Sequence, residues 1–391
     1  MKEIKNLKKA AERIKKAVKN KEKIILYGDA DLDGTTAVII LQDAIKNLGG
    51  KISAVYFPDR ELEGHGITEK GLKFLAKSHK KKTKKNKFSA LLVVLDCGVG
   101  NFKEVKMAKK LGFEVIIIDH HLVLNKLPEA EIIVDPKQKG DKYLFKDLSA
   151  AGLAFKLAEA LLKNKMSESL RKNFLELVAL ATIADMMPQK SENKIFIEQG
   201  KQSLKNSWRP GIRAFLETEP LKSYSHLNQK IFKIISILNV RDVENKLPAH
   251  YRLLNSSSLK EAKKIIKKLL KKTEKRKERI EEINSEVEKR LQEKEEPIVF
   301  EGDVNFDSNL ISSVASIISQ KYLKPVFLYK KMAKESCGTV RSPKEINSVF
   351  LMKKCSKLLI TFGGHAQASG FRIKNENLEK FKTCLIKQLK K

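Results

Sequence analysis

Four short apolar segments of this chain each run into an acidic residue, and this pattern restricts the possible folds more than any other feature. The segment 115–118 contains only Val and Ile and is followed at once by Asp119, His120 and His121. The other segments are 23–27 before Gly28 and Asp29, 91–95 before Asp96, and 132–134 before Asp135. Short apolar runs of this kind are typical of strands buried in a parallel sheet. One such segment could simply be a hydrogen-bonded strand terminus, but that interpretation does not explain four of them. Open α/β sheets bind ligands at the carboxyl ends of their strands, so we predict an α/β protein with its acids at one sheet edge.

Carboxylates that gather at one edge repel one another unless they take up protons or cations. The first segment is followed by three acids, Asp29, Asp31 and Asp33, and an apolar helix over 175–184 ends at Asp185. Asp and His side chains without thiols suit Mn²⁺ or Mg²⁺ better than a structural zinc ion. Two such ions a few ångströms apart are the usual machinery for phosphodiester hydrolysis. We therefore predict a hydrolase with two divalent metal ions.

The stretch from Asp29 to Gly34 also matches the opening of a calcium-binding EF-hand loop, D-x-D-x-D-G. An EF-hand has Glu at the twelfth position of the loop, whereas this chain has Ile40 there. Residues 35–48 moreover have the composition of an apolar helix directly after Gly34. The calcium interpretation is therefore much weaker than the two-metal interpretation.

The chain is strongly basic, with a formal net charge of +32 over 391 residues. This excess is far greater than solubility requires, and it indicates a polyanionic partner such as nucleic acid. The alternative is lysine enrichment across a whole lineage, as in many thermophiles, and it stays open because Lys greatly outnumbers Arg.

The cysteines provide no sign of a structural framework. The four of them, Cys97, Cys337, Cys355 and Cys384, show no paired spacing, so they suggest neither a zinc knuckle nor a disulfide framework. A reducing cytoplasm fits this usage. The first residues lack an apolar signal core and no run reaches membrane-spanning length, so we expect a cytoplasmic protein without a membrane partner.

Changes in pattern along the chain predict two α/β lobes that are joined by a helical region. Lys, Glu and Arg dominate residues 259–295, where apolar residues recur every three or four positions, as in a long exposed helix. Strands and helices alternate again after Pro297. The predicted domains are 1–220 (catalytic), 221–296 (helical region and connecting helix) and 297–391 (substrate-binding).

Two glycine-containing stretches could approach an anion closely. Arg60 lies shortly before Gly64 and Gly66, and the second lobe contains Arg341 and the stretch 363–365. Glycine permits close backbone approach, and Arg and His side chains can bind a phosphate. An exposed loop and a tight turn are the alternatives, and these residues alone do not separate the two interpretations.

Taken together, the motifs resemble those of the DHH phosphoesterase superfamily, and within it the RecJ-like single-strand exonucleases. The resemblance extends from Ile24 to Ile373. Its acidic motifs occur in the family's order: Gly28–Gly34, Leu95–Gly98, Asp119–His121 and Thr182–Asp185. The RecJ branch is indicated by 58–66, 149–155 and 209–214, and the DHH-associated domain by 315–325, 341–342 and 363–365.

The resemblance implies a ligand set for two ions, Mn²⁺ or Mg²⁺. One ion would be held by Asp29, Asp31 and Asp96, and the other by Asp33, Asp96, His120 and Asp185, with Asp96 shared. The same resemblance implies catalytic roles for Asp96, His120 and His121. It implies phosphate-binding roles for Arg60, His121, Arg341, Gly363, Gly364 and His365.

The chain also departs from the family's pattern. Tyr27 stands where many DHH proteins have His, so one metal is expected to depend on Asp29 and Asp31 instead. Only Asn239–Arg241 remains of the bacterial motif Asn-Ala-x-Gly-Arg. No oligonucleotide-binding barrel is expected after the second lobe, and this compact build resembles the archaeal RecJ-like nucleases. The resemblance implies a GINS-type replication complex as a partner, because some of those nucleases associate with one.

The function that the resemblance implies is metal-dependent, single-strand-specific exonuclease activity in DNA repair or replication. Digestion from 5′ to 3′ and DNA over RNA are favoured. One alternative is a small-substrate phosphodiesterase acting on nanoRNA or cyclic dinucleotides, and another is an inactive replication scaffold of the same fold. The basic excess and the helical insert favour a polymer, and intact acids at every motif argue against the scaffold.

Overall fold

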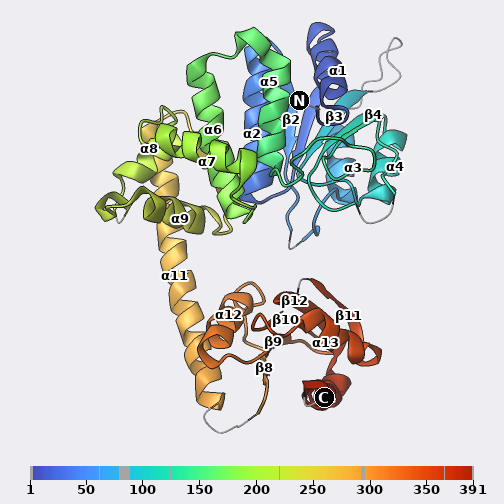
Figure 1. Ribbon diagram of the computed structural model, residues 1–391, viewed down its shortest axis with the longest axis vertical. Helices are drawn as coiled ribbons and strands as arrows, with labels where there is room; N and C mark the ends of the chain where they lie inside the picture. The colour runs from blue at the N-terminus through green and yellow to red at the C-terminus, as the bar shows by residue number, and fades with distance from the viewer. Residues whose placement is uncertain are drawn as a thin grey trace. The chain divides into compact units, whose positions relative to one another are not determined.

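The computed structural model describes residues 3–60, 62–78, 89–123, 126–219, 221–291, 296–364 and 366–389. The chain divides into two compact units, Met1–Leu270 and Lys271–Lys391, and each contains a sheet (Figure 1). The predicted α/β class, with a parallel-sheet lobe and a second, smaller lobe, is confirmed. None of the described helices is both long enough and apolar enough to cross a membrane.

The first unit contains a parallel sheet with the strand order β2-β1-β3-β4-β5. The strands are β1 (Ile24–Gly28), β2 (Ile52–Tyr56), β3 (Ala90–Leu95), β4 (Phe113–Ile118) and β5 (Ile132–Val134). Because all of them run in one direction, their carboxyl ends meet at one edge. The order reverses between β1 and β3, which is where open α/β sheets bind their ligands.

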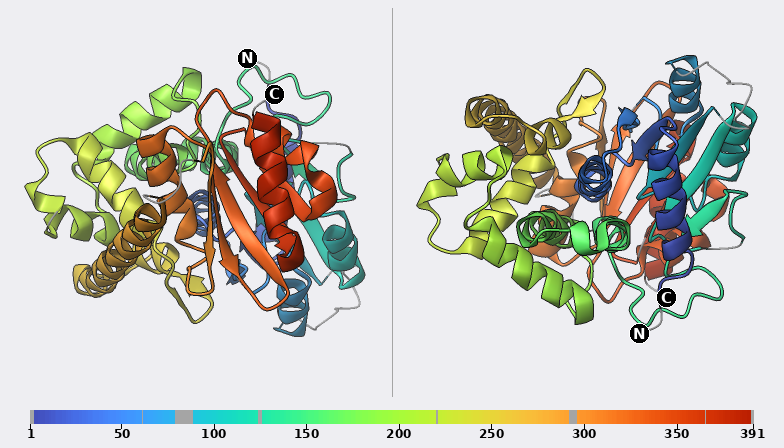
Figure 2. Two further views of the ribbon diagram at one scale, coloured as in Figure 1. Left: turned by 90° about the horizontal axis from the view of Figure 1, so that it is seen from below. Right: turned by 90° about the horizontal axis from the view of Figure 1, so that it is seen from above.

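Helices cover both faces of this sheet, because its strands are apolar on both sides. Ile24 and Leu26 of β1 pack in a core with α1, α2 and α5, whereas Ile25 and Tyr27 belong to a second core with α3 and α4. The two views of Figure 2 show these helices on opposite sides of the strands. The helices are α1 (Leu7–Lys19), α2 (Leu32–Asn47), α3 (Glu69–Ser78), α4 (Phe102–Lys110) and α5 (Ala150–Leu162).

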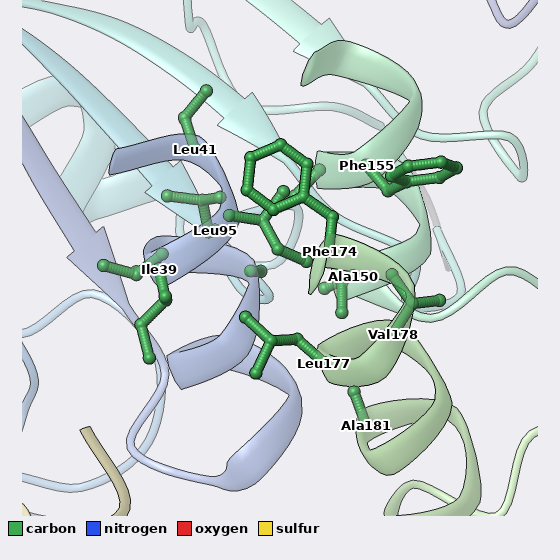
Figure 3. Close-up of a cluster of buried hydrophobic side chains, with 14 of the residues drawn as sticks. Ile39, Leu41, Leu95, Ala150, Phe155, Phe174, Leu177, Val178 and Ala181 are labelled. Carbon is green, nitrogen blue, oxygen red and sulfur yellow. The ribbon is translucent and has the colours of Figure 1, made fainter. Parts of the chain in front are cut away.

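A helical region extends the first core beyond α2. Figure 3 shows Phe174, Leu177 and Val178 of α6 packed near Ile39 of α2 and Phe155 of α5. The region consists of α6 (Glu168–Ala184), α7 (Ser191–Leu204), α8 (Pro210–Glu217), α9 (Leu227–Leu238), the hairpin strands β6 (Val243–Glu244) and β7 (Leu247–Pro248), and α10 (Ala249–Leu254). This packing fixes the carboxyl end of α6, which carries Asp185, relative to the start of α2.

Helix α11 (Leu259–Leu291) is the long helix that the charge pattern predicted. Its first half contributes Ala262, Ile266 and Leu269 to the core of the first unit. Its second half contributes Ile283 and Val287 to a core of the second unit. The regularly spaced apolar residues of α11 are therefore buried at both of its ends.

The second unit contains a mixed sheet with the order β11-β12-β10-β9-β8. Helix α12 packs on one face, and α13 and α14 pack on the other around Phe327, Phe371 and Phe381. Its elements are β8 (Val299–Asp303), α12 (Ile311–Tyr322), β9 (Val326–Lys331), β10 (Glu335–Arg341), α13 (Ser348–Lys354), β11 (Leu359–Gly364), β12 (Ala368–Lys374) and α14 (Leu378–Leu389).

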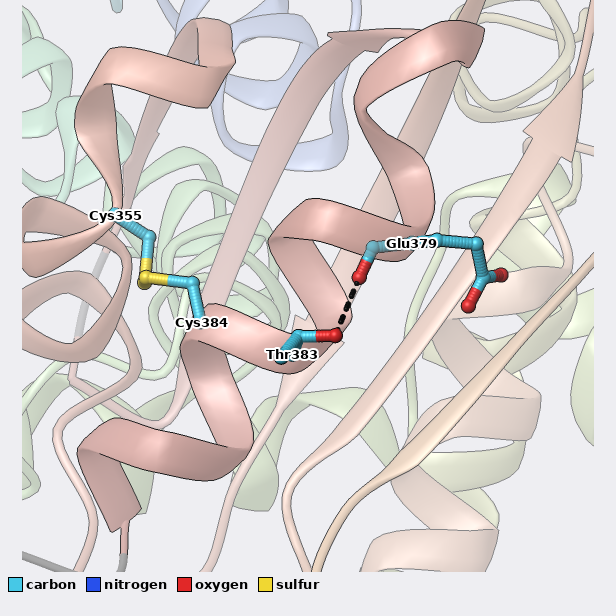
Figure 4. Close-up of a disulfide and its surroundings, with 4 residues drawn as sticks. All are labelled: Cys355, Glu379, Thr383 and Cys384. Carbon is cyan, nitrogen blue, oxygen red and sulfur yellow. Dashed lines mark hydrogen bonds between the residues drawn. A yellow bond between two sulfur atoms is a disulfide. The ribbon is translucent and has the colours of Figure 1, made fainter.

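The cysteine spacing suggested no disulfide framework, but the structure contains a disulfide in the second unit. Cys355, at the end of α13, is bonded to Cys384 of α14 (Figure 4). The two residues are 29 positions apart and meet because both helices pack on the same face of the second sheet. Cys97 and Cys337 are free. The cysteine pattern therefore gives no support to a reducing compartment.

Candidate metal centre

The acids predicted from the strand ends gather at the carboxyl edge of the first sheet. Asp29 follows β1, Asp96 follows β3, His120 lies just beyond β4, and Asp185 follows α6. Three sets of ligand atoms each lie within 4.8 Å of one another: Asp29 with Asp31 and Asp96, Asp33 with His120 and Asp185, and Asp96 with His120 and His121. We call these seven residues the acidic cluster. Asp96 and His120 each belong to two of the three sets, so they connect the sets into one cluster.

Asp33 lies inside helix α2, although the sequence pattern had predicted that this helix starts only after Gly34. Helix α2 begins at Leu32 because Asp31 caps it, and an Asp31 carboxylate oxygen accepts the Gly34 N–H at 2.9 Å. The Asp33 carboxylate accepts the N–H groups of Ala150 and Ala151, at 2.7 and 2.8 Å, at the start of α5. Burial and the charges of Asp185 and Asp31 nevertheless raise the pKa of Asp33 to about 8.

His120 points its Nε2 atom at three carboxylates. The distances are 3.2 Å to Asp96, 3.6 Å to Asp185 and 3.7 Å to Asp33. Burial lowers the pKa of His120 to about 4, so the ring is neutral at pH 7 and does not offset these charges. A neutral imidazole among carboxylates is the form in which histidine binds a metal.

His121 is fixed by Asp119, the buried first residue of the same motif. An Asp119 oxygen lies 2.7 Å from His121 Nδ1 and accepts the backbone N–H of His120 at 2.8 Å. The other Asp119 oxygen accepts the N–H of Val99 at 3.0 Å. The bond to Asp119 raises the pKa of His121 to about 9. Asp119 therefore orients the motif.

The donor set of the cluster fits divalent cations. Burial raises the pKa of Asp96 well above its usual range, and burial raises that of Asp185 to about 6. One Asp185 oxygen is buried without a hydrogen-bond partner. Asp96 adopts a left-handed backbone with φ of 64°, a conformation that is costly for non-glycine residues and concentrates at functional sites. Oxygen ligands with an imidazole nitrogen suit Mn²⁺ and Mg²⁺.

Arg60 and Tyr27 have clear roles in the structure. The Arg60 guanidinium contacts Asp29 at 3.0 Å and Asp31 at 2.8 Å, so it borders the cluster. The Tyr27 hydroxyl donates to the carbonyl oxygen of Gly66 at 3.1 Å and accepts the N–H of Thr68 at 3.0 Å. Tyr27 thus holds the loop that contains Gly66. Its side chain lies in the second core, on the face of the sheet that α3 and α4 cover.

A pocket of about 1070 Å³ opens beside the cluster. Asp31, Asp33 and Asp185 line one part of it, and Phe74 of α3 and the β6–β7 hairpin line another. His250 of α10 also lines the pocket, although the sequence interpretation missed it. Its Nδ1 atom lies 3.3 Å from the carbonyl oxygen of Leu238. No local motif marks His250, because only the packing of α10 brings it to the cluster.

His250 should make stability depend on pH. Burial lowers the pKa of His250 to about 4, whereas an unfolded histidine has a pKa near 6.5. Between these values only the unfolded chain takes up the proton, so stability falls as the pH falls from about 6.5 to about 4. In urea unfolding with a chelator present, the wild type should lose about 2 kcal/mol more than His250→Gln between pH 7 and pH 5. Equal losses in both proteins would contradict a neutral, buried His250.

The predicted phosphate-binding residues of the second unit lie at one end of its sheet. Arg341 pairs with Ala368 and Gly364 pairs with Ser369, so β10 and β11 meet the start of β12 there. The Arg341 guanidinium donates to Ser316 Oγ at 3.1 Å. Gly364 has φ of 129°, which side chains rarely tolerate. Gly363 also lies on β11, and His365 lies outside the described residues.

Two family models match the chain. The model described as the DHH family, N-terminal domain, matches residues 23–182, and the DHHA1 domain matches residues 295–391. A curated relative, the single-stranded-DNA-specific exonuclease RecJ of Bacillus subtilis, is 30% identical over 393 residues, which is 98% of this chain and 48% of the relative. RecJ of Thermus thermophilus is 27% identical and matches 97% of this chain and 54% of its own length. The chain thus spans about half the length of these relatives.

The solved structures agree on the fold. A crystal structure of exonuclease RecJ bound to manganese has a TM-score of 0.79 at 25% identity, and it covers 99% of this chain and 94% of that chain. A crystal structure of RecJ from Thermus thermophilus in complex with Mn²⁺ also has a TM-score of 0.79, at 24% identity, and matches 98% of this chain and 55% of that one.

Proposed function

The chain belongs to the DHH phosphoesterase superfamily, in its RecJ-like branch, and from this we propose that it is a divalent-metal-dependent exonuclease acting on single-stranded nucleic acid. The observation that carries the proposal is the acidic cluster, which joins carboxylates and histidines from β1, β3, β4 and α6 at the switch point of the sheet. The printed names of the relatives support single-stranded DNA as the substrate class, and the charge of +32 suits a polyanion.

The cluster provides ligands for two ions, Mn²⁺ or Mg²⁺. We propose that Asp29, Asp31 and Asp96 hold one ion, and that the other set, which shares Asp96, consists of Asp33, Asp96, His120 and Asp185. Bound cations of this kind lower the pKa of a water ligand and stabilise charge on a phosphate.

The remaining polar residues would bind and orient the substrate. His121, which Asp119 keeps protonated at pH 7, can donate to a phosphate oxygen. Arg60, at the border of the cluster, can do the same through its planar guanidinium. We propose that Arg341, Gly363, Gly364 and His365 bind the phosphates of the strand on the second unit. The proposed domains remain 1–220, 221–296 and 297–391.

The test compares substrates under one condition. The full chain is incubated with Mn²⁺ and 3′-labelled single-stranded DNA, single-stranded RNA, duplex DNA and linear or cyclic dinucleotides. We expect rapid loss of nucleotides from the 5′ end of single-stranded DNA, slower attack on RNA, and little on duplex. Faster hydrolysis of dinucleotides than of the polymer would support a small-substrate phosphodiesterase instead. Inactivity on every substrate would support the scaffold.

Binding should weaken with salt, because lysines release counterions from phosphates when they bind a strand. Each contact with single-stranded nucleic acid contributes about −0.7 to the slope of log affinity against log salt. Three to six contacts would give a slope of about −2 to −4. Fluorescence anisotropy of labelled single strands across salt concentrations measures it. A flat plot would mean that the charge of +32 reflects lysine enrichment of a lineage rather than substrate binding.

We also propose a GINS-type replication complex as a partner. This partner is tested by mixing the purified proteins and following co-elution in size-exclusion chromatography. Separate elution at micromolar concentrations would count against it.

A further inference from the structure

The pocket beside the acidic cluster is also lined by an exposed aromatic ring. Phe74 of α3 is 42% exposed, although it lines the pocket. The buried Tyr56 ring lies 5.7 Å from it, and Tyr27 lies 5.3 Å from Tyr56. The Phe74 ring thus contacts a buried aromatic pair and still lines the pocket.

A lysine lies over the Phe74 ring. Lys246 Nζ is 3.4 Å from the ring centroid. Lys246 and Asn245 form the turn between β6 and β7, and both have positive φ, 63° and 54°. Turns with two positive φ values are the tight hairpin turns that match the twist of paired strands. The turn thus places Lys246 where its ammonium group reaches the face of the Phe74 ring.

Cations also line the wall of the pocket beside Phe74. Lys70, Lys73 and Lys77 lie on one side of α3 and line the same pocket as Lys246. Lys73 pairs with Glu69, and Lys70 lies 3.9 Å from Glu63. The Lys73–Glu69 pair is exposed and therefore weak, whereas Lys77 and Lys246 line the pocket without a close carboxylate in the described part of the chain. Phe74 therefore shares this pocket with four lysines, Lys70, Lys73, Lys77 and Lys246.

The pocket is large enough for a ligand longer than one nucleotide. Its volume of about 1070 Å³ lies just above the roughly 300–1,000 Å³ that is usual for sites that bind one small molecule. Phe74 lines the same pocket as Asp31, Asp33 and Asp185. A strand whose phosphate lies at the cluster can therefore extend along the pocket past the ring.

We propose that Phe74 is a stacking platform for one base of the single-stranded substrate, and that Lys77 and Lys246 bind the adjoining phosphates. The proposal rests on the proposed function, and it identifies where the strand lies. A base would take the ring face that Lys246 covers, and the ammonium group would move to a phosphate. An aromatic face with flanking cations is the arrangement that binds single strands without regard to sequence.

The first test compares Phe74→Ala with the wild type on a 3′-labelled oligothymidylate and on a series of the same strand with one abasic position. With Mn²⁺, we expect kcat/KM on the intact strand to fall by about 5- to 100-fold, mainly through KM, because this is what loss of one stacked base costs. One strand of the series lacks the base that stacks on Phe74, and on it the wild-type kcat/KM should already be low. On that strand the kcat/KM of Phe74→Ala should differ from the wild-type value by less than about twofold. Phe74→Tyr should behave like the wild type, and Phe74→Leu, which keeps the apolar bulk without a ring face, should behave like Phe74→Ala.

Phe102→Ala is the matched control. Phe102 is 36% exposed with Lys126 5.8 Å from its ring centroid, but it does not line the pocket, so its loss should leave kcat/KM unchanged. Equal losses on all strands, or no loss with Phe74→Ala, would overturn the platform while the wild type remained active. A wild type that hydrolyses no strand would overturn both this proposal and the proposed function.

The lysines are tested by the salt dependence of KM. Lys77→Gln should make the slope shallower by about 0.7, which corresponds to one phosphate contact on a single strand. An unchanged slope would remove Lys77 from the proposed path of the strand.

Discussion

Replacing Asp96 by Asn should abolish hydrolysis while the fold stays intact. A ligand atom of Asp96 lies within 4.8 Å of those of Asp29 and Asp31 in one set, and of those of His120 and His121 in another. The loss of Asp96 should therefore disturb both proposed ions. We expect activity on single-stranded DNA to fall by at least about a hundredfold, which corresponds to about 2.7 kcal/mol of lost transition-state stabilisation. The measurement is single-turnover hydrolysis with Mn²⁺, with the melting temperature determined in a chelator on the same samples.

Asn is a better replacement here than Ala. The backbone of Asp96 has φ of 64°, and Asn is among the few residues with a side chain that tolerate this region. Asp96 is 2% exposed, and burial raises its pKa, so a neutral amide of equal size should cost little stability. A matched control is Asp135→Asn, a buried carboxylate after β5 that belongs to none of the three sets. Activity above about a hundredth of the wild type in Asp96→Asn would contradict the proposed bridging role.

The parallel sheet was predictable because its strands are short, apolar and bounded by polar residues. The ranges predicted for β3 and β4 differ from the structure by no more than a few residues. The helix after β1 was placed too late, because the sequence alone does not reveal that Asp31 accepts the Gly34 N–H and starts α2 at Leu32. All three acids were therefore expected before the helix, whereas Asp33 lies in its first turn.

The parts of the site that escaped prediction depend on contacts between distant segments. Asp33 is bound by the start of α5, which lies over a hundred positions away along the chain. His250 and the Lys246 turn reach the pocket only through the packing of the helical region. The disulfide between Cys355 and Cys384 follows from two helices on one sheet face, and neither cysteine has a local spacing that indicates it. The local periodicity of a sequence carries no information about contacts between segments that are far apart in the chain.

Removal of divalent metal should abolish activity and lower stability together. Exhaustive chelation leaves the carboxylates of the cluster to repel one another, as the raised pKa values of Asp33 and Asp185 indicate. Mn²⁺ should restore hydrolysis at least as well as Mg²⁺, since the ligands include an imidazole. Because the ions bind only the folded chain, Mn²⁺ at about a hundredfold excess over its dissociation constant should add about 2.7 kcal/mol of stability.

The thermal shift separates metal binding from catalysis, because it does not require substrate. Asp96→Asn should lose most of the shift with Mn²⁺, whereas Phe74→Ala should keep it, since Phe74 lies in the pocket outside the three sets. A large shift with Ca²⁺ and none with Mn²⁺ would contradict the proposed site for Mn²⁺ or Mg²⁺. Activity that survives exhaustive chelation would exclude metal-dependent hydrolysis, because the proposed ions would then play no part in activating the attacking water.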